Sequence, residues 1–200
     1  MSKINIITIE RQFASGGRQV GSLVAQELGF KFYNEEILQL ASQKLNTQPQ
    51  NVEHLEEVLP NSLLYGLAMA TDFNSEGVFA DRLFQTESEI IRNIAVEGKC
   101  VIVGRCAGQI LATRKDVLNV FIYADEDTRI ARAVNEYGVP EKEVHTRLSK
   151  IDKRRNSFYN VHTRKQWGDM GTYDLCLDSG RLGIETCTEI IKAAVNRWKE

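Results

Sequence analysis

A short stretch near the N-terminus carries the residues best suited to bind an anion. Residues 4–9 form a largely apolar run rich in β-branched side chains, and a turn of small residues at 14–17 follows. From Val20 onward apolar residues recur at helical spacing, which predicts a helix. The three segments in order therefore predict a strand, a glycine turn and a helix N-terminus. Such a junction gathers unpaired backbone N–H groups at the positive end of a helix dipole, where phosphate binds. Arg18 adds a fixed positive charge beside the turn.

The turn departs from the common phosphate-loop pattern G-x-x-x-x-G-K-[ST]. With the lysine at position 18, this pattern requires Gly at 12 and Ser or Thr at 19. The chain has Gln12, Arg18 and Gln19 instead, and only Gly17 fits. The competing interpretation is an ordinary strand-to-helix turn, in which Gly16 and Gly17 relieve backbone strain.

A second candidate is Arg105, which follows the apolar run 100–103 through Gly104. A continuous apolar run is typical of a strand buried on both faces, so a guanidinium directly after it would face a cleft. It could hold a phosphate through two parallel hydrogen bonds. A structural ion pair at the sheet edge is the alternative. We favour binding, because the opening loop ends on the same side of the predicted sheet.

A third candidate is the basic segment that follows residue 125. Arg129 and Arg132 are three residues apart and share a helix face, and Asp152 and Arg155 are also one turn apart in the basic stretch 147–155. These residues could form a movable basic cover over a polyphosphate, closing to exclude water. A solvated charged helix is the alternative. A nucleic-acid surface over 147–167 is weaker still, given the acidic balance of the chain.

Strands and helices must alternate to position these groups. Besides the first strand, runs of apolar residues predict strands at 31–33, 100–103, 118–124 and 173–177. Helical spacing predicts helices over 20–28, over 35–45 with Asn34 as N-cap, up to Gly98, from Asp125, from Pro140 as first residue, and up to Trp198. Residues 46–77 are irregular, with a helix at 62–70. We therefore expect a mainly parallel sheet covered on both faces.

In such a sheet ligands bind beyond the C-terminal ends of the strands. The polar groups of the sequence fall there, at 10–19 and at Asn34, Arg105, Asp125 and Asp178. We expect one domain over residues 1–200.

Composition narrows the classes of protein further. The chain has 200 residues and a net charge of −2, which gives no general attraction to nucleic acid or anionic membranes. Its four cysteines lack a C-x-x-C pair, and its three histidines lack metal-ligand spacing, so buried reduced thiols and no structural zinc are expected. No apolar run reaches a membrane span, and no signal-peptide layout is present, which predicts a cytoplasmic protein.

Taken together, these segments resemble the cytidylate kinase-like family, a P-loop branch related to bacterial cytidylate kinases and other nucleoside monophosphate kinases. The resemblance covers most of the chain and is thinnest at 46–80. It is carried by the Ser-Gly-Gly-Arg loop within 9–21 and by 32–38, 101–107, 120–124, 129–132, 151–155, 167–169 and 173–179.

The resemblance implies a three-layer P-loop fold with a five-stranded parallel sheet, an acceptor-binding region at 46–80 and a lid at 129–167. It implies transfer of the ATP γ-phosphoryl group to a pyrimidine monophosphate, CMP or dCMP, with Mg²⁺. By this resemblance, the donor phosphates bind to Ala14, Ser15, Gly16, Gly17, Arg18 and Gln19. The acceptor nucleotide binds to Asn34, Arg105 and Arg129. The catalytic residues are Arg18, Arg132, Asp152 and Arg155.

Three positions differ from cytidylate kinases. Cys106 stands where those enzymes have an aspartate that helps bind the acceptor sugar, Arg18 replaces lysine, and Gln19 lacks the hydroxyl that would hold Mg²⁺. The metal would then depend on water, Asp125 or Glu10. A kinase-like domain that senses a nucleotide or another anion with little turnover is the alternative function. The expected partners are small-molecule nucleotides, without a membrane and without nucleic acid.

Overall fold

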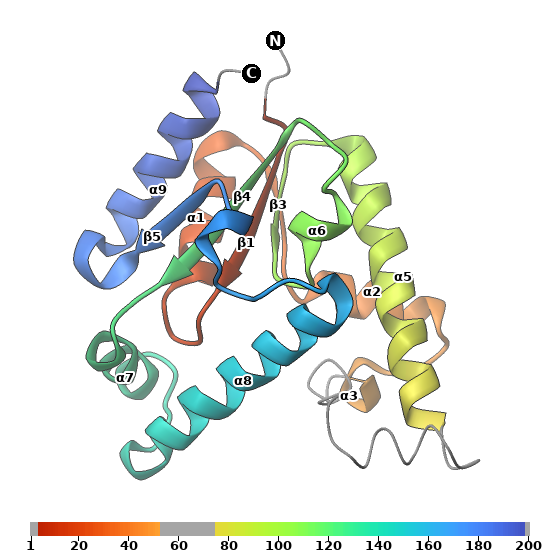
Figure 1. The fold of residues 1–200 in the computed structure, drawn as a ribbon, viewed down its shortest axis with the longest axis horizontal. Coiled ribbons are helices and arrows are strands. Elements are labelled where there is room, and N and C mark those ends of the chain that lie inside the picture. The colour runs from red at the N-terminus through yellow and green to blue at the C-terminus, as the bar shows by residue number, and fades with distance from the viewer. Residues whose placement is uncertain (1–3, 53–74, 199–200) are drawn as a thin grey trace.

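The computed structural model describes residues 4–52 and 75–198, in which strands and helices alternate (Figure 1). The strands are β1 (Ile6–Arg11), β2 (Lys31–Tyr33), β3 (Cys100–Val103), β4 (Val117–Tyr123) and β5 (Leu175–Asp178). The helices are α1 (Gly17–Leu28), α2 (Glu36–Lys44), α3 (Pro49–Val52), α5 (Ser75–Glu97), α6 (Ala107–Ile110), α7 (Glu126–Asn135), α8 (Val144–Thr163) and α9 (Ser179–Arg197). Two 3₁₀ turns, η2 (Glu141–Glu143) and η3 (Met170–Thr172), complete the described chain.

The five strands form one parallel sheet, which confirms the predicted parallel sheet, and the structure gives their order as β2-β3-β1-β4-β5. β1 lies at the centre, with Ile7 paired to Val101 of β3 and to Leu118 of β4. The chain reverses its direction of winding at this strand, since β3 lies on one side of it and β4 on the other. The crevice beyond the C-terminal end of β1 is therefore where this topology places a ligand.

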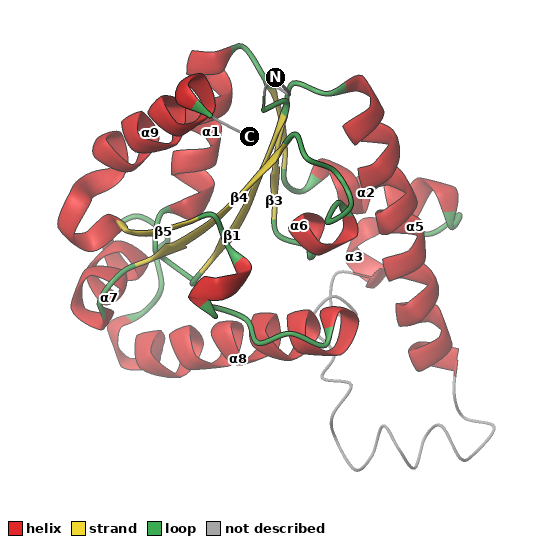
Figure 2. Cartoon of the chain, turned by 45° about the horizontal axis from the view of Figure 1, so that its top comes forward, coloured by secondary structure: helices red, strands yellow, loops and turns green. Residues whose placement is uncertain are grey.

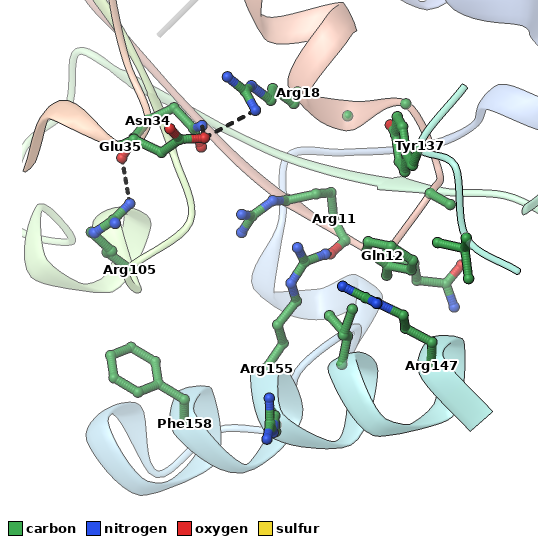
Figure 3. A pocket seen from close by; sticks show the side chains of 17 residues that line it. Arg11, Gln12, Arg18, Asn34, Glu35, Arg105, Tyr137, Arg147, Arg155 and Phe158 are labelled. Carbon is green, nitrogen blue, oxygen red and sulfur yellow. Dashed lines mark hydrogen bonds and ion pairs between the residues drawn. The ribbon is translucent and has the colours of Figure 1, made fainter. Parts of the chain in front are cut away.

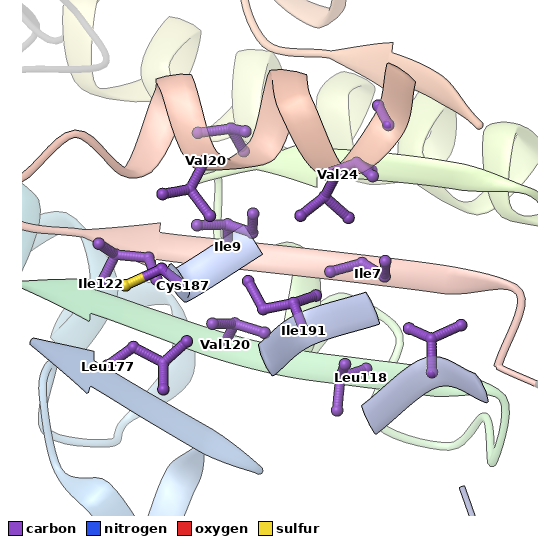
Figure 4. Close-up of a cluster of buried hydrophobic side chains, with 14 of the residues drawn as sticks. Ile7, Ile9, Val20, Val24, Leu118, Val120, Ile122, Leu177, Cys187 and Ile191 are labelled. Atoms are coloured by element: carbon purple, nitrogen blue, oxygen red, sulfur yellow. The ribbon is translucent and has the colours of Figure 1, made fainter. Parts of the chain in front are cut away.

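Two hydrophobic cores cover the two faces of the sheet. Successive strand side chains point to opposite faces, so Ile7 and Ile9 pack with α1 and α9 (Figure 4), whereas Ile6 packs with α2 and α5. Figure 2 shows these helix pairs on either side of the strands. Both faces are thus buried, which explains the continuous apolar run of β3 and the largely apolar sequence of β4.

Helix α8 has a different position from the packing helices. It runs across the C-terminal end of the sheet, together with α7, rather than along a face (Figures 1 and 2). A third, smaller apolar cluster joins it to the loop after β1, with Ala14 packed among Ala133, Val144 and Leu148. The basic segment therefore covers the edge at which ligands bind.

Two predicted helix starts are wrong. Asn34 does not cap α2, because Glu35 holds the N-cap position without a side-chain bond, while Glu36 reaches back to accept from the Asn34 N–H at 2.8 Å. Pro140 precedes the 3₁₀ turn η2, and α8 begins only at Val144. The predicted helix at 62–70 lies outside the described residues.

The structure bears on the expectations about the cysteines and about membrane-spanning helices. All four cysteines are free, and Cys100, Cys106 and Cys187 are buried, as the sequence predicts for three of them. Within 4–52 and 75–198, no helix combines the length and apolar character needed to cross a lipid bilayer.

Candidate functional site

A cavity of about 480 Å³ lies between the loop after β1, the ends of β2 and β3, and helix α8 (Figure 3). Among the residues that the structure describes, six arginines line it, and Glu35 is the one carboxylate in that lining. The lining consists of Arg11, Gln12, Phe13, Ala14, Gly16, Gly17, Arg18, Asn34, Glu35, Arg105, Tyr137, Val139, Arg147, Ile151, Arg154, Arg155 and Phe158. Such an excess of guanidinium groups in one cavity fits a ligand with several negative charges.

The loop after β1 is fixed by hydrogen bonds to its backbone. The Ser15 hydroxyl is fully buried and lies 2.9 Å from the Gln12 carbonyl and 3.0 Å from the Ile122 carbonyl. From the other side, the Ser179 hydroxyl at the start of α9 donates to the Ser15 carbonyl at 2.5 Å. These bonds tie the loop to β4 and α9, so its shape is set before any ligand arrives.

The loop leads into α1 through Gly16, which is the N-cap residue and has a φ of 77°. This left-handed conformation is open to glycine at little cost. The first bond within the helix runs from the Val20 N–H to the Gly16 carbonyl, so the N–H groups of the three preceding residues have no partner inside the helix. Gly17 and Arg18 line the cavity, which brings two of these three residues to its wall.

A buried ion pair connects helices α7 and α8 to the loop. Arg129 of α7 contacts the Asp152 carboxylate of α8 at 2.8 Å, and the other oxygen of Asp152 accepts from the Phe13 N–H at 2.7 Å. Arg132 donates to the Ala14 carbonyl at 2.9 Å. Helices α7 and α8 are therefore docked on the loop through three residues that the family resemblance assigns to catalysis or substrate binding.

Two further arginines meet at the end of β1. Arg155 of α8 donates to the carbonyl of Arg11 at 3.0 Å, and both side chains line the cavity. Burial, together with the neighbouring Arg11 guanidinium, lowers the pKa of Arg155 to about 9. An anion bound between the two would offset their repulsion and raise this pKa again.

Arg105 is held in place from two directions. Its Nε donates to the buried Glu87 carboxylate of α5 at 2.9 Å, and its Nη1 donates to the Asn34 carbonyl at 2.5 Å. Residues 104–106 all have positive φ, which turns the chain sharply from β3 into α6. Cys106 points into the protein, and its N–H donates to Glu10 at 3.3 Å. The structure thus gives Arg105 both an ion pair and a place on the cavity wall.

The structure brings together part of the predicted site. Ala14, Gly16, Gly17, Arg18, Asn34, Arg105 and Arg155 line the cavity, whereas Ser15, Gln19, Arg129, Arg132 and Asp152 do not. Of the second group, Ser15, Arg129, Arg132 and Asp152 bind the loop or the lid, and Gln19 is exposed. Arg18 is ion-paired with Glu35 at 3.0 Å on the rim, where both side chains are about two-thirds exposed. The catalytic roles expected for Arg18, Arg132, Asp152 and Arg155 stay predictions.

Sequence reasoning gave no individual role to several residues of the cavity, above all Arg11, Glu35 and Arg154. Arg11 lies within 10–19 and Arg154 within 147–155, two segments that the sequence places near the ligand, whereas Glu35 was expected only at the start of a helix. Glu35 comes shortly after β2, so the rule that ligands bind beyond strand ends could have found it. Glu87 was recognisable in another way, since it is a charged residue within the apolar periodicity of α5 and is 1% exposed.

Aromatic residues of α8 and of the segment after it pack against other elements of the protein. His162 stacks on Phe84 of α5 with a ring separation of 3.8 Å, and Phe158 meets Phe84 edge to face at 5.7 Å. Trp167 packs edge to face against Phe121, and its indole N–H donates to Glu10. These contacts join α8 and the segment that follows it to the body of the protein.

The side chains of the cavity do not fit a dedicated Mg²⁺ site. Glu10 accepts from Cys106 and Trp167, and Asp125 caps α7 by accepting from Thr128, so both carboxylates considered from the sequence are engaged elsewhere. Within the described part of the chain, no three His, Cys, Asp or Glu residues cluster as metal ligands. Mg²⁺ often stays bound to substrate phosphates and water with few protein ligands, and that is the mode this cavity allows.

Solved structures of other proteins are similar to this fold. An uncharacterized protein from Eubacterium ventriosum is 26% identical with a TM-score of 0.74, covering 96% of this chain and 98% of that chain. Shikimate kinase from Bacteroides thetaiotaomicron is 10% identical with a TM-score of 0.57, covering 96% and 98%. Shikimate kinase from Acinetobacter baumannii, solved with shikimate, is 13% identical with a TM-score of 0.55, covering 99% and 97%. The two shikimate kinases share the fold.

The sequence itself identifies the family. No curated protein matches the chain. The family model described as the cytidylate kinase-like family matches residues 6–181, which include every strand, the loop after β1 and the whole cavity lining. The chain belongs to the cytidylate kinase-like family.

Proposed function

We propose that this protein is a kinase that transfers the γ-phosphoryl group of ATP to a pyrimidine nucleoside monophosphate, CMP or dCMP. The observation that carries the proposal is the cavity: six arginines and the N-terminus of α1 line a single space of about 480 Å³. Donor and acceptor together bring several phosphate groups to one place, and phosphoryl transfer depends mainly on positioning them and neutralising their charge. The choice of cytidine as the base comes from the family resemblance.

The two ends of the cavity suit two different ligands. The N–H groups at the start of α1 and the arginines of α8 would hold the donor triphosphate. Asn34, Arg105 and Phe158 lie at the other end, where the acceptor would bind (Figure 3). Transfer would be in line, without a covalent protein intermediate, and α8 would keep water from the phosphoryl group. Mg²⁺ would arrive with the nucleotide and neutralise phosphate charge.

A substrate panel tests this proposal. We expect ATP and Mg²⁺ to give ADP release with the highest kcat/KM for CMP or dCMP, compared with the uridine, thymidine, adenosine and guanosine monophosphates and with shikimate. ADP release with shikimate alone would contradict the proposed acceptor. The measurement is a coupled assay of ADP at fixed ATP with each acceptor titrated.

An anion or nucleotide sensor is the second candidate, favoured by the ion pair that Arg18 makes with Glu35 and by the absence of a hydroxyl at Gln19. A sensor would be stabilised by ligand without turning it over. At a ligand concentration 100 times Kd, stabilisation of about 2.7 kcal/mol is expected for either function. A thermal shift with ATP, CMP or phosphate, combined with no ADP release across the panel, would favour the sensor.

Arg105 offers a test of the acceptor end. Replacing Arg105 with Ala should raise the KM for the acceptor about tenfold, because it removes a charged hydrogen-bond donor, while the KM for ATP changes less than about twofold. Glu87→Gln should move the acceptor KM in the same direction, because Glu87 holds the Arg105 Nε at 2.9 Å.

The matched control is Arg147→Ala, which removes an arginine from the opposite end of the same cavity. We expect it to raise the KM for ATP more than the KM for the acceptor. Steady-state titration of each substrate separates the two effects. If Arg105→Ala acts mainly on ATP, Arg105 belongs to the donor end.

A further inference from the structure

Side chains at positions 11 and 17, on either side of the loop after β1, would occupy the same space. Gly17 is the first residue of α1, and a Cβ atom placed on it would lie 2.6 Å from the Cβ and 3.1 Å from the Cγ of Arg11. Protein interiors are packed too closely to admit such an approach between two side chains. Only one of the two positions can therefore carry a long side chain, and in this protein it is position 11.

These two positions have the spacing of the common phosphate-loop pattern. In G-x-x-x-x-G-K-[ST], the first glycine and the lysine are six residues apart, and the second glycine directly precedes the lysine. Positions 11 and 17 are also six apart, and Gly16 directly precedes 17 as the N-cap of α1. The structure thus supports a register one residue earlier than the one considered from the sequence. In this register the cation stands at the first position and glycine at the position of the lysine.

The side chain of Arg11 is directed into the centre of the site. Figure 3 shows its guanidinium in the space between Arg105 and Arg155. It also lies against the end of β3, since a Cβ atom on Gly104 would contact its Nη1 and lie 3.2 Å from its Cζ. Arg18, by contrast, points to Glu35 on the rim of the cavity (Figure 3).

We propose that Arg11 supplies the phosphate-binding charge that lysine supplies in the common pattern, with the long side chain and the glycine exchanged between positions 11 and 17. The proposal rests on the proposed function, because it takes a phosphoryl group as the ligand. Both arrangements deliver one cation to the same space, from the end of the strand in one case and from the first residue of the helix in the other. Mutual exclusion of the two side chains explains why the exchange involves both positions.

Moving the cation back tests the proposal. The variants are Arg11→Gly, Gly17→Lys and the double variant, with Arg92→Ala, an exposed arginine of α5, as the control for lost charge. The readouts are the Kd for inorganic triphosphate and for ATP by calorimetry, the thermal midpoint, and kcat and KM. Arg11→Gly should weaken triphosphate binding at least about tenfold, and Arg92→Ala less than about twofold.

Gly17→Lys alone should lower the thermal midpoint, because Arg11 occupies the space. The double variant should recover triphosphate binding to within about threefold of the wild type, which an unfolded Arg11→Gly protein could not explain. Equal binding by wild type and Arg11→Gly, no recovery in the double variant, or a larger loss from Arg18→Ala than from Arg11→Gly would each overturn the proposal. If the wild type itself binds neither triphosphate nor ATP, the proposed function fails instead.

Discussion

Replacing Asp152 with Ala should lower the free energy of unfolding by about 4 kcal/mol, because it leaves a buried cation without its carboxylate. Arg129 is 8% exposed and contacts Asp152 at 2.8 Å, while the second carboxylate oxygen accepts from the Phe13 N–H. One substitution therefore breaks an ion pair and a loop hydrogen bond together. Urea unfolding of the wild type and the variant measures the loss, provided that the slope of the transition is unchanged.

Removing both partners distinguishes the ion pair from the loop bond. Asp152→Leu combined with Arg129→Met replaces the pair with apolar side chains, which is often nearly neutral for a buried pair. We expect the double variant to recover most of the stability but to keep a deficit of about 1 kcal/mol from the lost Phe13 hydrogen bond. If the two changes are additive, Asp152 and Arg129 do not interact, and the docking role of this pair is wrong.

Replacing Gly16 with Ala should cost about 3 kcal/mol of stability, from backbone strain and overpacking together. Gly16 has a φ of 77°, and a Cβ atom there would clash with Ile184 Cδ1 and lie 3.2 Å from Nη1 of Arg132. Ile184 is buried in the core, and Arg132 is bonded to the Ala14 carbonyl, so any relaxation would disturb the loop. Anion binding should be lost along with stability, as measured by thermal shift with phosphate.

Gly29 supplies the matched control. It also has a positive φ, 65°, but a Cβ atom there would meet nothing within 4 Å. Gly29→Ala should therefore cost only the backbone strain, about 1 kcal/mol, and should leave phosphate binding intact. Similar losses from both substitutions would mean that the clash at Gly16 is relieved without cost, and that loop geometry does not depend on this glycine.

The sequence by itself determined the alternation of strands and helices in this protein. Strands β3 and β4 can be predicted because both faces of a central parallel strand are buried, so β3 is an unbroken apolar run and β4 is apolar except at Asn119. The alternation of strands and helices then fixes a parallel sheet, and strand ends fix the edge at which Arg105 and the loop meet. The local sequence pattern was enough to predict these features, because burial requires apolar residues at regular spacing along each helix and strand.

Only the tertiary structure decided which charged side chains face the cavity. Asp152 and Arg129 lie in a basic helical region, but they come from different helices and pair with each other, and Asp152 also accepts from the Phe13 N–H. Arg11 was unremarkable in the sequence, and its central position follows from the room that Gly17 leaves beside it. A side chain's direction depends on contacts made across the fold, and the spacing of residues along one helix or loop does not contain that information.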